Sequence, residues 1–481
     1  MTAKKVLSGH QFRYRSILHQ SPAIKAAIRS IGPDGRAAVY AQGNSIKRAE
    51  SAIEIIRHFS GDSAEETILK EEFVSAQQDL GDGIARLAAI FDGALCAVNE
   101  LLAAGVHPTQ HSRAVSSLLG ELDRHFESVT TPYAGPDSLI NTFDLPDTAV
   151  NVIKEALSAA GEGGHVEVSE NDEPGVQYQQ VKGFIADMKP LTRGPFLPMD
   201  QVYVLVINDI LQDQSNLLSI IEGFANSDKS LVIAARGLAG SAKQLLEINR
   251  SSGVLRVVVF EPEQKGTMAE LILADLAAAT GATLVCEKLG QSLSRLTPNM
   301  LGMASGCRIQ GSRMILSEPK ADASAVAMRL KEIEADIHKA RYLELDRENS
   351  RRRYARLAGN WVEITVGKSA TTPGLHERVS RACSAVRMAQ HSGVIAGGGV
   401  GLTAVADRLA AKKRVSSADN AAIYMLTRAL KGPQQALRQN AAKESPVQEL
   451  SDPAELSRKL AHIASSLALQ FMTIEAAVLR S

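Results

Sequence analysis

Residues 393–401, GVIAGGGVG, place three consecutive glycines directly after a short apolar run. Glycine adopts backbone conformations that are closed to other residues, and it lets two segments approach closely. Residues 399–404 also fit a loose GxGxxA pattern, but no strand–helix–strand unit is evident around it, as a dinucleotide site would need. We therefore interpret this stretch as a tight turn between helices with close backbone packing.

The composition around this turn is that of a folded, multidomain protein. Of the 481 residues, 45% are hydrophobic and 22% are charged, which predicts about three domains with buried cores. Lys plus Arg and Asp plus Glu both number 53, so the formal net charge is zero. Proteins that coat nucleic acid are usually basic, and aromatic residues, which could stack on bases, make up only 4%. We expect no nucleic-acid partner, although the basic first 50 residues leave an interface role open.

Cysteine usage and hydropathy indicate a cytoplasmic protein. The four cysteines form no CxxC pair, which is typical of reduced thiols rather than of disulfides or a zinc site. The first residues contain no apolar region of a secretory signal. The longest apolar runs, such as 202–207 and 254–260, are too short to span a membrane. We expect a cytoplasmic location and no membrane contact.

Periodicity divides the chain into three zones. Residues 1–125 have helical patterns, whereas 165–320 alternate short β-branched runs with helices, as in an α/β domain. From residue 321 the patterns are helical again, apart from a strand at 361–366, and one long helix is predicted over 454–479. A helical domain built from both chain ends, with an α/β domain inserted, explains this order.

Six segments, taken together, resemble motifs of the bacterial type of chaperonin, the GroEL family. They are IGPDGR at 31–36 (similar to LGPKGR), GDG at 81–83, the DLA and TGAT residues within 275–283, the DRE and LAG residues within 346–359, GVIAGGG at 393–399 (similar to GVVAGGG), and DP at 452–453. Each motif alone is modest, but their order and spacing are specific. The chain is identified as a divergent member of this family.

The resemblance implies a multidomain α+β chaperonin fold. Its helical equatorial domain would comprise residues 1–123 and 393–481. A small intermediate domain would comprise 124–183 and 360–392, and the inserted α/β apical domain would comprise 184–359. Gly183 and Gly359-Asn360 are then candidate hinges, because glycine absorbs the dihedral changes that a hinge needs.

The same resemblance implies ATP and Mg²⁺ as cofactors. The positions that match the family's nucleotide site are Gly32, Pro33, Arg48, Asp82, Gly83, Arg86, Gly398 and Asp452. Asp82 matches the magnesium-binding aspartate. The threonine run that follows it in the family is replaced by Ile84-Ala85-Arg86, which removes hydroxyl donors and leaves Arg86 as a candidate phosphate contact.

Two acids that the resemblance leads us to expect are missing. Ala49 stands at the acid of the family's KDG motif, although Glu50 lies next to it, and Arg381 stands at the acid that speeds hydrolysis. A positioned acid or base typically contributes about 10²–10⁴-fold to a rate. We therefore assign no catalytic residue and expect ATP hydrolysis to be weak or lost.

The client-binding surface is also altered. Leu218, Ile221 and Ile248 match apolar groove residues of the family, but Lys243 and Glu247 stand where it has further apolar residues. Apolar contact area drives the capture of unfolded chains. A groove with two charges is expected to bind fewer clients, or a particular one.

These features predict a divergent chaperonin-like protein that binds non-native or specific client proteins and assists their folding or assembly, with weak or lost ATP hydrolysis. Two alternatives stay open. The first is an active ATP-driven folding chaperonin with a co-chaperonin lid. This alternative is supported by the retained Asp82, Gly398 and Asp452. The second is a structural subunit that mixes into rings with an ordinary chaperonin. By resemblance, a homo-oligomeric ring would have seven subunits.

Overall fold

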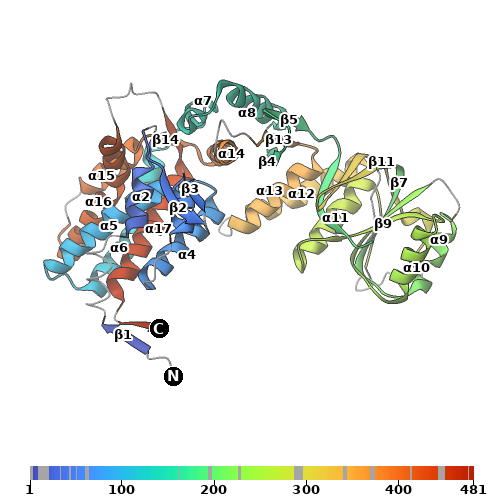
Figure 1. Ribbon diagram of the computed structural model, residues 1–481, viewed down its shortest axis with the longest axis horizontal. Helices are drawn as coiled ribbons and strands as arrows, with labels where there is room; N and C mark the ends of the chain where they lie inside the picture. Colours follow the sequence, from blue (N-terminus) through green and yellow to red (C-terminus); the bar gives the residue numbers. More distant parts are fainter. Residues whose placement is uncertain are drawn as a thin grey trace. The chain divides into compact units, whose positions relative to one another are not determined.

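The computed structural model describes most of the chain. The described residues are 4–8, 21–32, 34–42, 45–49, 51–59, 64–161, 163–192, 198–225, 229–286, 296–339, 344–368, 374–411, 414–441, 450–474 and 476–480. They form two compact units (Figure 1). The first unit comprises Met1–Asn151, Asp172–Pro174 and Gly367–Ser481, and the second comprises Val152–Asn171 and Gly175–Val366. The central part of the chain is thus inserted into a unit made from both ends, and the three-domain boundaries stay a prediction.

The first unit is mainly helical. Its helices are α2 (Pro22–Arg29), α3 (Ala52–His58), α4 (Ala64–Leu80), α5 (Ile84–Ala103), α6 (Pro108–Val129), α7 (Asp137–Ile140), the start of α8 (Asp147–Ala160), α14 (Leu375–Ser392), α15 (Val400–Ala410), α16 (Ser417–Asn440) and α17 (Ala454–Thr473). Among the described residues, no helix is long and apolar enough to cross a membrane.

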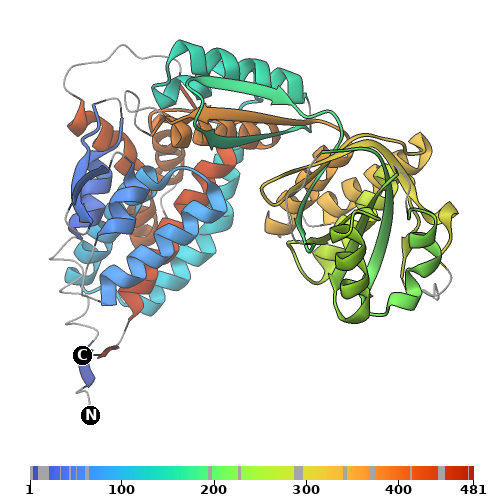
Figure 2. The same ribbon diagram turned by 45° about the vertical axis from the view of Figure 1, so that its right-hand side comes forward.

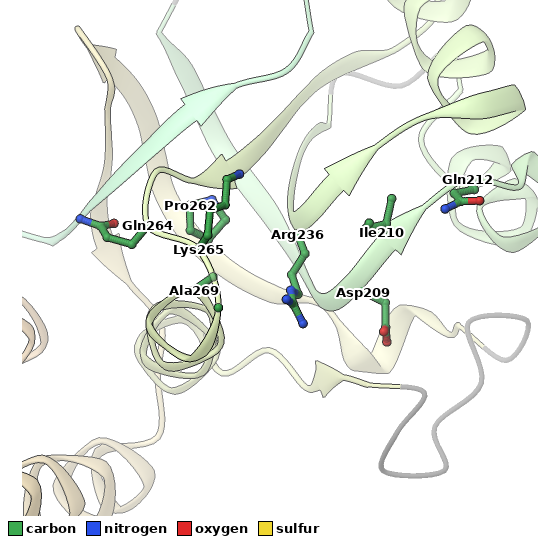
Figure 3. A pocket seen from close by; sticks show the side chains of 9 residues that line it. Asp209, Ile210, Gln212, Arg236, Pro262, Gln264, Lys265 and Ala269 are labelled. Carbon is green, nitrogen blue, oxygen red and sulfur yellow. The ribbon is translucent and has the colours of Figure 1, made fainter.

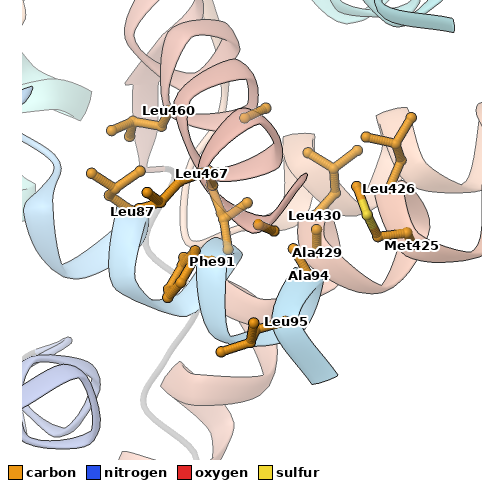
Figure 4. Close-up of a cluster of buried hydrophobic side chains, with 14 of the residues drawn as sticks. Leu87, Phe91, Ala94, Leu95, Met425, Leu426, Ala429, Leu430, Leu460 and Leu467 are labelled. Atoms are coloured by element: carbon orange, nitrogen blue, oxygen red, sulfur yellow. The ribbon is translucent and has the colours of Figure 1, made fainter. Parts of the chain in front are cut away.

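Helix α5 forms the centre of this unit. It is apolar nearly all round, as is typical of a helix covered on every side. Leu87 and Phe91 of α5 pack among residues of α16 and α17, including Leu430 and Leu467 (Figure 4). Phe91 also makes an edge-to-face contact with Phe471, with ring centroids 5.8 Å apart. This packing fixes the first turn of α5, where the candidate site begins.

Three short antiparallel strand pairs complete the first unit. They are β2 (Ala38–Gln42) with β3 (Ser45–Ala49), β14 (Val394–Ala396) with β15 (Ser451–Pro453), and β1 (Lys4–Ser8) with β16 (Ala476–Arg480). The prediction of one helix over 454–479 is wrong at its end, because α17 stops at Thr473. By pattern alone, the apolar residues of 476–480 fit either a helix or a strand. They form the strand β16 because they pair with β1, which is distant in the sequence.

The second unit contains a seven-stranded mixed sheet (Figure 2). Its strands are β6 (Phe184–Pro190), β7 (Met199–Leu211), β8 (Ser230–Leu238), β9 (Arg256–Pro262), β10 (Leu284–Val285), β11 (Gly302–Gln310) and β12 (Arg313–Pro319). The order is β10-β7-β11-β12-β6-β9-β8, and β7 also pairs with β8, so the sheet closes on itself. Strands β7, β8 and β9 run parallel, as their alternation with helices predicts.

Helices cover two faces of this sheet. They are α9 (Leu218–Glu222) and α10 (Gly240–Ser251) on one side, and α11 (Thr267–Thr280), α12 (Ala323–Lys339) and α13 (Glu344–Leu357) on the other. Alternate residues of β7 enter the two cores: Val204 and Val206 face the α11 side, whereas Leu205 and Ile207 face the α9 side.

A three-stranded sheet completes the second unit. Its order is β4 (His165–Asn171), β13 (Trp361–Gly367) and β5 (Val176–Gln180), and β13 is the strand that the sequence predicts at 361–366. Two single passages of chain join this sheet to the seven-stranded body, one between β5 and β6 and one between α13 and β13.

Candidate functional site

The turn before α5 places Asp82 in a buried position. Gly81 and Gly83 both have positive φ angles, 72° and 93°. A Cβ atom at Gly83 would lie 2.7 Å from Leu460 Cδ1, so the turn packs directly on α17 and requires glycine there. Asp82, between the two glycines, is only 4% exposed. A carboxylate in such a place must be paired.

Two arginines hold this carboxylate. Arg381 of α14 donates from Nε to Asp82 Oδ1 at 2.7 Å, and Arg86 of α5 donates from Nη2 to Oδ2 at 3.3 Å. Arg86 Nη1 also lies 2.6 Å from Oδ1 of Asp452, which is buried on β15. We call these four residues, Asp82, Arg86, Arg381 and Asp452, the arginine-clamped site. Its formal charges balance.

The clamp keeps Asp82 ionised. Burial works to raise the pKa of Asp82, but the charges of Arg381 and Arg86 and the hydrogen bonds from Arg381 and the Gly83 N–H outweigh it, so the pKa lies below its usual value. Burial opposes the charge of Arg381 as well, yet Asp82 raises the pKa of its guanidinium. Burial raises the pKa of Asp452, with Arg86 opposing and Asp82 adding to the rise.

The triple-glycine turn contacts Leu450, which lies two residues before Asp452. Gly397 donates its N–H to the Leu450 carbonyl at 2.8 Å, and its own Cβ would lie 2.8 Å from that residue's carbonyl carbon. Gly399 is the N-cap residue that precedes α15, and a Cβ there would lie 2.7 Å from Gln434 N. Gly398 has a φ of 63°, but nothing lies within 4 Å of its Cβ position. The predicted tight turn is therefore present, although it joins a strand, β14, to a helix.

The remaining predicted nucleotide residues lie elsewhere in the first unit. Gly32 lies in the turn that follows α2 and has a φ of 89°. A Cβ there would lie 2.8 Å from Leu437 Cδ2. Arg48 lies on the exposed face of β3, whereas Ala49 is fully buried. Pro33 and Glu50 lie outside the described residues.

The arginine-clamped site does not fit a magnesium ion. Mg²⁺ needs free carboxylate oxygens near-ideally arranged together with waters and phosphates. Both oxygens of Asp82 already accept from guanidinium groups. In the part of the chain that the structure describes, no three His, Cys, Asp or Glu side chains group as metal ligands. The resemblance predicts a charge reversal at Arg381, but the sequence could not reveal that Arg381 pairs with Asp82.

The predicted client-binding residues divide into two groups. Leu218 on α9 and Ile248 on α10 are exposed, at 44% and 66%. Ile221 is only 6% exposed and packs in the core beneath α9, so it offers little surface to a client, and its role as a groove residue stays a prediction. Lys243 and Glu247 are half-buried on α10. The surface thus combines isolated apolar side chains with charge.

A cavity that sequence reasoning missed lies at the carboxyl ends of β7, β8 and β9 (Figure 3). It measures about 430 Å³ and is lined in part by Asp209, Arg236 and Lys265. Ligands of α/β sheets often bind at this edge. Both cations are already paired, since Arg236 Nη1 lies 3.1 Å from Glu270 Oε1 and Lys265 Nζ lies 3.1 Å from Glu261 Oε1.

Comparisons with known proteins agree with this architecture. A model of the TCP-1/cpn60 chaperonin family matches residues 206–459, more than half of the chain. Two crystal forms of the chaperonin gp146 from the bacteriophage EL 2 (Pseudomonas aeruginosa), both in presence of ATP-BeFx, are similar over 99% of this chain and 99% of their own. Their TM-scores are 0.78 and 0.71 at 15% sequence identity, a likeness that shows the fold. The predicted chaperonin fold is confirmed, and the chain belongs to the TCP-1/cpn60 chaperonin family.

Proposed function

We propose that this chaperonin binds non-native or specific client proteins and assists their folding or assembly with weak or lost ATP hydrolysis. The observation that carries the proposal is the pairing of Asp82 with both Arg381 and Arg86. The carboxylate that would hold Mg²⁺ in an active relative instead stabilises two internal cations.

Phosphoryl transfer depends on metal ions and on a group that orients the attacking water. In this chain the two family acid positions are Ala49, which is fully buried, and Arg381, which is cationic. Losing one such group costs about 3–5 kcal/mol of barrier, which corresponds to 10²–10⁴-fold in rate. Losing both, together with the metal ligand, supports turnover far below that of an active chaperonin.

Nucleotide binding is a separate question from hydrolysis. The similar phage protein was crystallised in presence of ATP-BeFx. In this chain the arginine-clamped site has no excess positive charge for a phosphate, since each guanidinium contacts a carboxylate. This balance favours loss of the Mg²⁺–ATP complex over its retention, and it argues against Arg86 as a phosphate contact.

The surface of α9 and α10 supports client binding of restricted range. Leu218 and Ile248 offer exposed apolar area, but Lys243 and Glu247 interrupt it. Charged groups next to apolar contacts impose specificity, because a partner that leaves them unpaired binds less well. A particular client with complementary charges fits this surface better than the general pool of unfolded chains.

Self-association is supported by the β2–β3 hairpin. Val39 and Ile46 on this hairpin are 73% and 81% exposed, and within the described residues no third strand pairs with it. Exposed apolar strands of this kind usually contact another chain. A second copy of this subunit is the proposed occupant, as in a homo-oligomeric ring, and a subunit of an ordinary chaperonin in a mixed ring is the alternative.

The decisive experiment is steady-state ATP hydrolysis with Mg²⁺ by the purified protein and by its Asp82→Ala variant. We expect both proteins to hydrolyse ATP at the same background rate, because the variant removes only a carboxylate that is already paired. The rate that remains in the variant measures any contaminating chaperonin. Turnover that Asp82→Ala abolishes would overturn the proposal in favour of an active folding machine. Suppression of client aggregation, measured without nucleotide, should be unchanged by Asp82→Ala and reduced by Ile248→Ser.

A further inference from the structure

Strand β5 lies at an edge of the three-stranded sheet. Among the described residues its only strand partner is β13, which separates it from β4. Residues 177–180 are exposed one after another, so side chains on both faces of the strand reach solvent. Tyr178, in the middle of the strand, is 38% exposed. This edge of the sheet therefore has room for a strand of another chain.

The hydrogen-bond pattern shows which backbone groups of β5 point away from the sheet. Val181, the residue after β5, donates its N–H to the Trp361 carbonyl of β13 at 3.1 Å. β5 and β13 are antiparallel, and in such a ladder residues that bond to the partner strand alternate with residues whose N–H and C=O groups point away. Counting back from Val181, the outward groups belong to Val176, Tyr178 and Gln180.

This edge lacks the features that usually keep a strand from pairing. Proteins guard exposed edges with charged side chains, proline or bulges. The sequence of β5, VQYQQ, contains no charge and no proline, and its register with β13 is unbroken. β4, at the opposite edge of the same sheet, is different, because Arg313 of β12 contacts its Glu167 at 2.8 Å. The β5 edge thus fits a strand that is used for pairing.

The strand is suited to antiparallel pairing with a second copy of itself. A two-fold axis at Tyr178 would place Val176 of one copy opposite Gln180 of the other. All three outward-facing residues would then form hydrogen-bonded pairs, which is the arrangement that an antiparallel ladder needs. Gln177 of one copy would lie opposite Gln179 of the other, and amide side chains both donate and accept hydrogen bonds.

The charges on either side of β5 favour the same arrangement. Glu173 lies three residues before the strand and Lys182 two residues after it, and both are exposed. With the two-fold axis at Tyr178, the acidic end of each strand meets the basic end of the other. Parallel pairing in register would instead set like charges side by side. Opposite charges at the rim of a contact select the partner and its orientation.

We propose that β5 is a docking edge for β5 of a second copy of this chain, which pairs with it antiparallel about Tyr178. The three-stranded sheets of two subunits then form one continuous sheet. This contact belongs to the second unit, and it is separate from the β2–β3 hairpin and from the arginine-clamped site. A single short strand buries little area, so the association is weak and depends on concentration.

Cysteine cross-linking of the full-length protein tests the register. Residues 177 and 179 of opposite copies form a non-hydrogen-bonded pair, whose Cα atoms lie about 4.5 Å apart, within the range of a disulfide. Under mild oxidation, a mixture of the Gln177→Cys and Gln179→Cys proteins should form at least about tenfold more linked dimer than either alone, where the thiols are two positions out of register. Wild-type protein, with its four free cysteines, gives the background. Equal yields in the mixture and the single variants, or no dimer in the mixture, would overturn the proposal.

A charge placed on the two-fold axis separates pairing from random collision. Tyr178→Lys, added to both cysteine variants, sets like charges opposite each other and should lower the dimer yield at least about fivefold at low salt. The yield should recover in 1 M NaCl, which screens the repulsion. Tyr178→Phe is the matched control and should leave the yield unchanged. An undiminished yield with Tyr178→Lys would contradict pairing about this residue.

Proline at the edge tests the backbone contact itself. Gln180→Pro removes an outward N–H but no bond to β13, so the dimer should be lost while the emission of Trp361, the only tryptophan, stays that of the folded sheet. Gln180→Ala keeps the N–H and should keep the dimer. Tyr178→Lys decides the case if Gln180→Pro fails to fold. If Gln177→Cys links to an added cysteine-containing unfolded protein but not to Gln179→Cys, an extended client segment occupies the edge and self-pairing is wrong.

Discussion

Two buried aspartates of this chain, Asp275 and Asp82, each pair with two arginine side chains, but the two sets of contacts differ. Asp275 on α11 accepts two hydrogen bonds from Arg353, at 2.6 and 2.9 Å, and one from Arg329 at 2.8 Å. Asp82 also contacts two arginines, but each by a single bond, and the side chain of Arg381 is 30% exposed. Asp275 holds helices α11, α12 and α13 of the second unit together, whereas Asp82 lies at a position where the family resemblance predicts a metal ligand.

The two sets of ion pairs also differ in geometry. A bidentate pair such as Asp275–Arg353 has the fork geometry of a dedicated structural contact. The bonds to Asp82 are monodentate, and the family resemblance predicts a threonine and an acid at the positions of Arg86 and Arg381. We therefore expect the Asp82 pairs to contribute less to stability than those of Asp275.

The largest effect is expected at Asp275. Asp275→Asn should destabilise the second unit by about 3–5 kcal/mol, because it removes the closest charged partner of the buried Arg353 and leaves it only the longer contact with Asp336. Urea denaturation followed by Trp361 fluorescence reports this unit alone. A loss below about 1 kcal/mol would mean that the bidentate geometry carries no special weight.

Glu167 extends the comparison to pH. Burial raises its pKa, but the hydrogen bond to His165 and the charge of Arg313 outweigh it and lower the pKa from 4.5 to about 2. Since the folded-state pKa is the lower one, the stabilisation is complete above pH 4.5 and is lost as the pH falls toward 2. At pH 7 the free energy of unfolding of the wild-type protein should exceed that of the Glu167→Gln variant by roughly 3 kcal/mol. The gap should shrink between pH 4.5 and 2, and a gap that does not change with pH would contradict the assignment.

A smaller effect is expected at Asp82. Asp82→Asn should cost about 1–3 kcal/mol, because Arg381 can turn toward solvent and Arg86 keeps Asp452. Hydrogen exchange of the α5 amides measures this loss within the first unit. A cost equal to that of Asp275→Asn would erase the distinction drawn between the two aspartates.

The sequence predicted more of the fold than of the site. The glycine turn, the inserted α/β zone and the strand at 361–366 follow from local patterns, because they depend on periodicity and turn chemistry. The end of α17 was missed, since its strand partner lies at the other end of the chain. The pairing of Arg381 with Asp82 was also out of reach, because it joins residues that are 299 positions apart.

The smallest expected effect is the response of the wild-type protein to Mg²⁺. With both oxygens of Asp82 occupied, Mg²⁺ with or without ATP should shift the melting temperature of the first unit by less than about 1 °C, since a ligand stabilises only by binding the folded state. In the double variant Arg86→Thr with Arg381→Asp, the guanidiniums are removed and a second carboxylate is introduced beside Asp82, so Mg²⁺ with ATP should stabilise measurably. Arg378→Asp, at a half-buried arginine of the same helix that contacts Asp144 rather than Asp82, is the matched control and should gain nothing. If Mg²⁺ with ATP stabilised the wild-type protein as strongly as the double variant, the arginine-clamped site would have to open and admit the metal. Asp82 would then be an available metal ligand and not a structural ion-pair residue like Asp275.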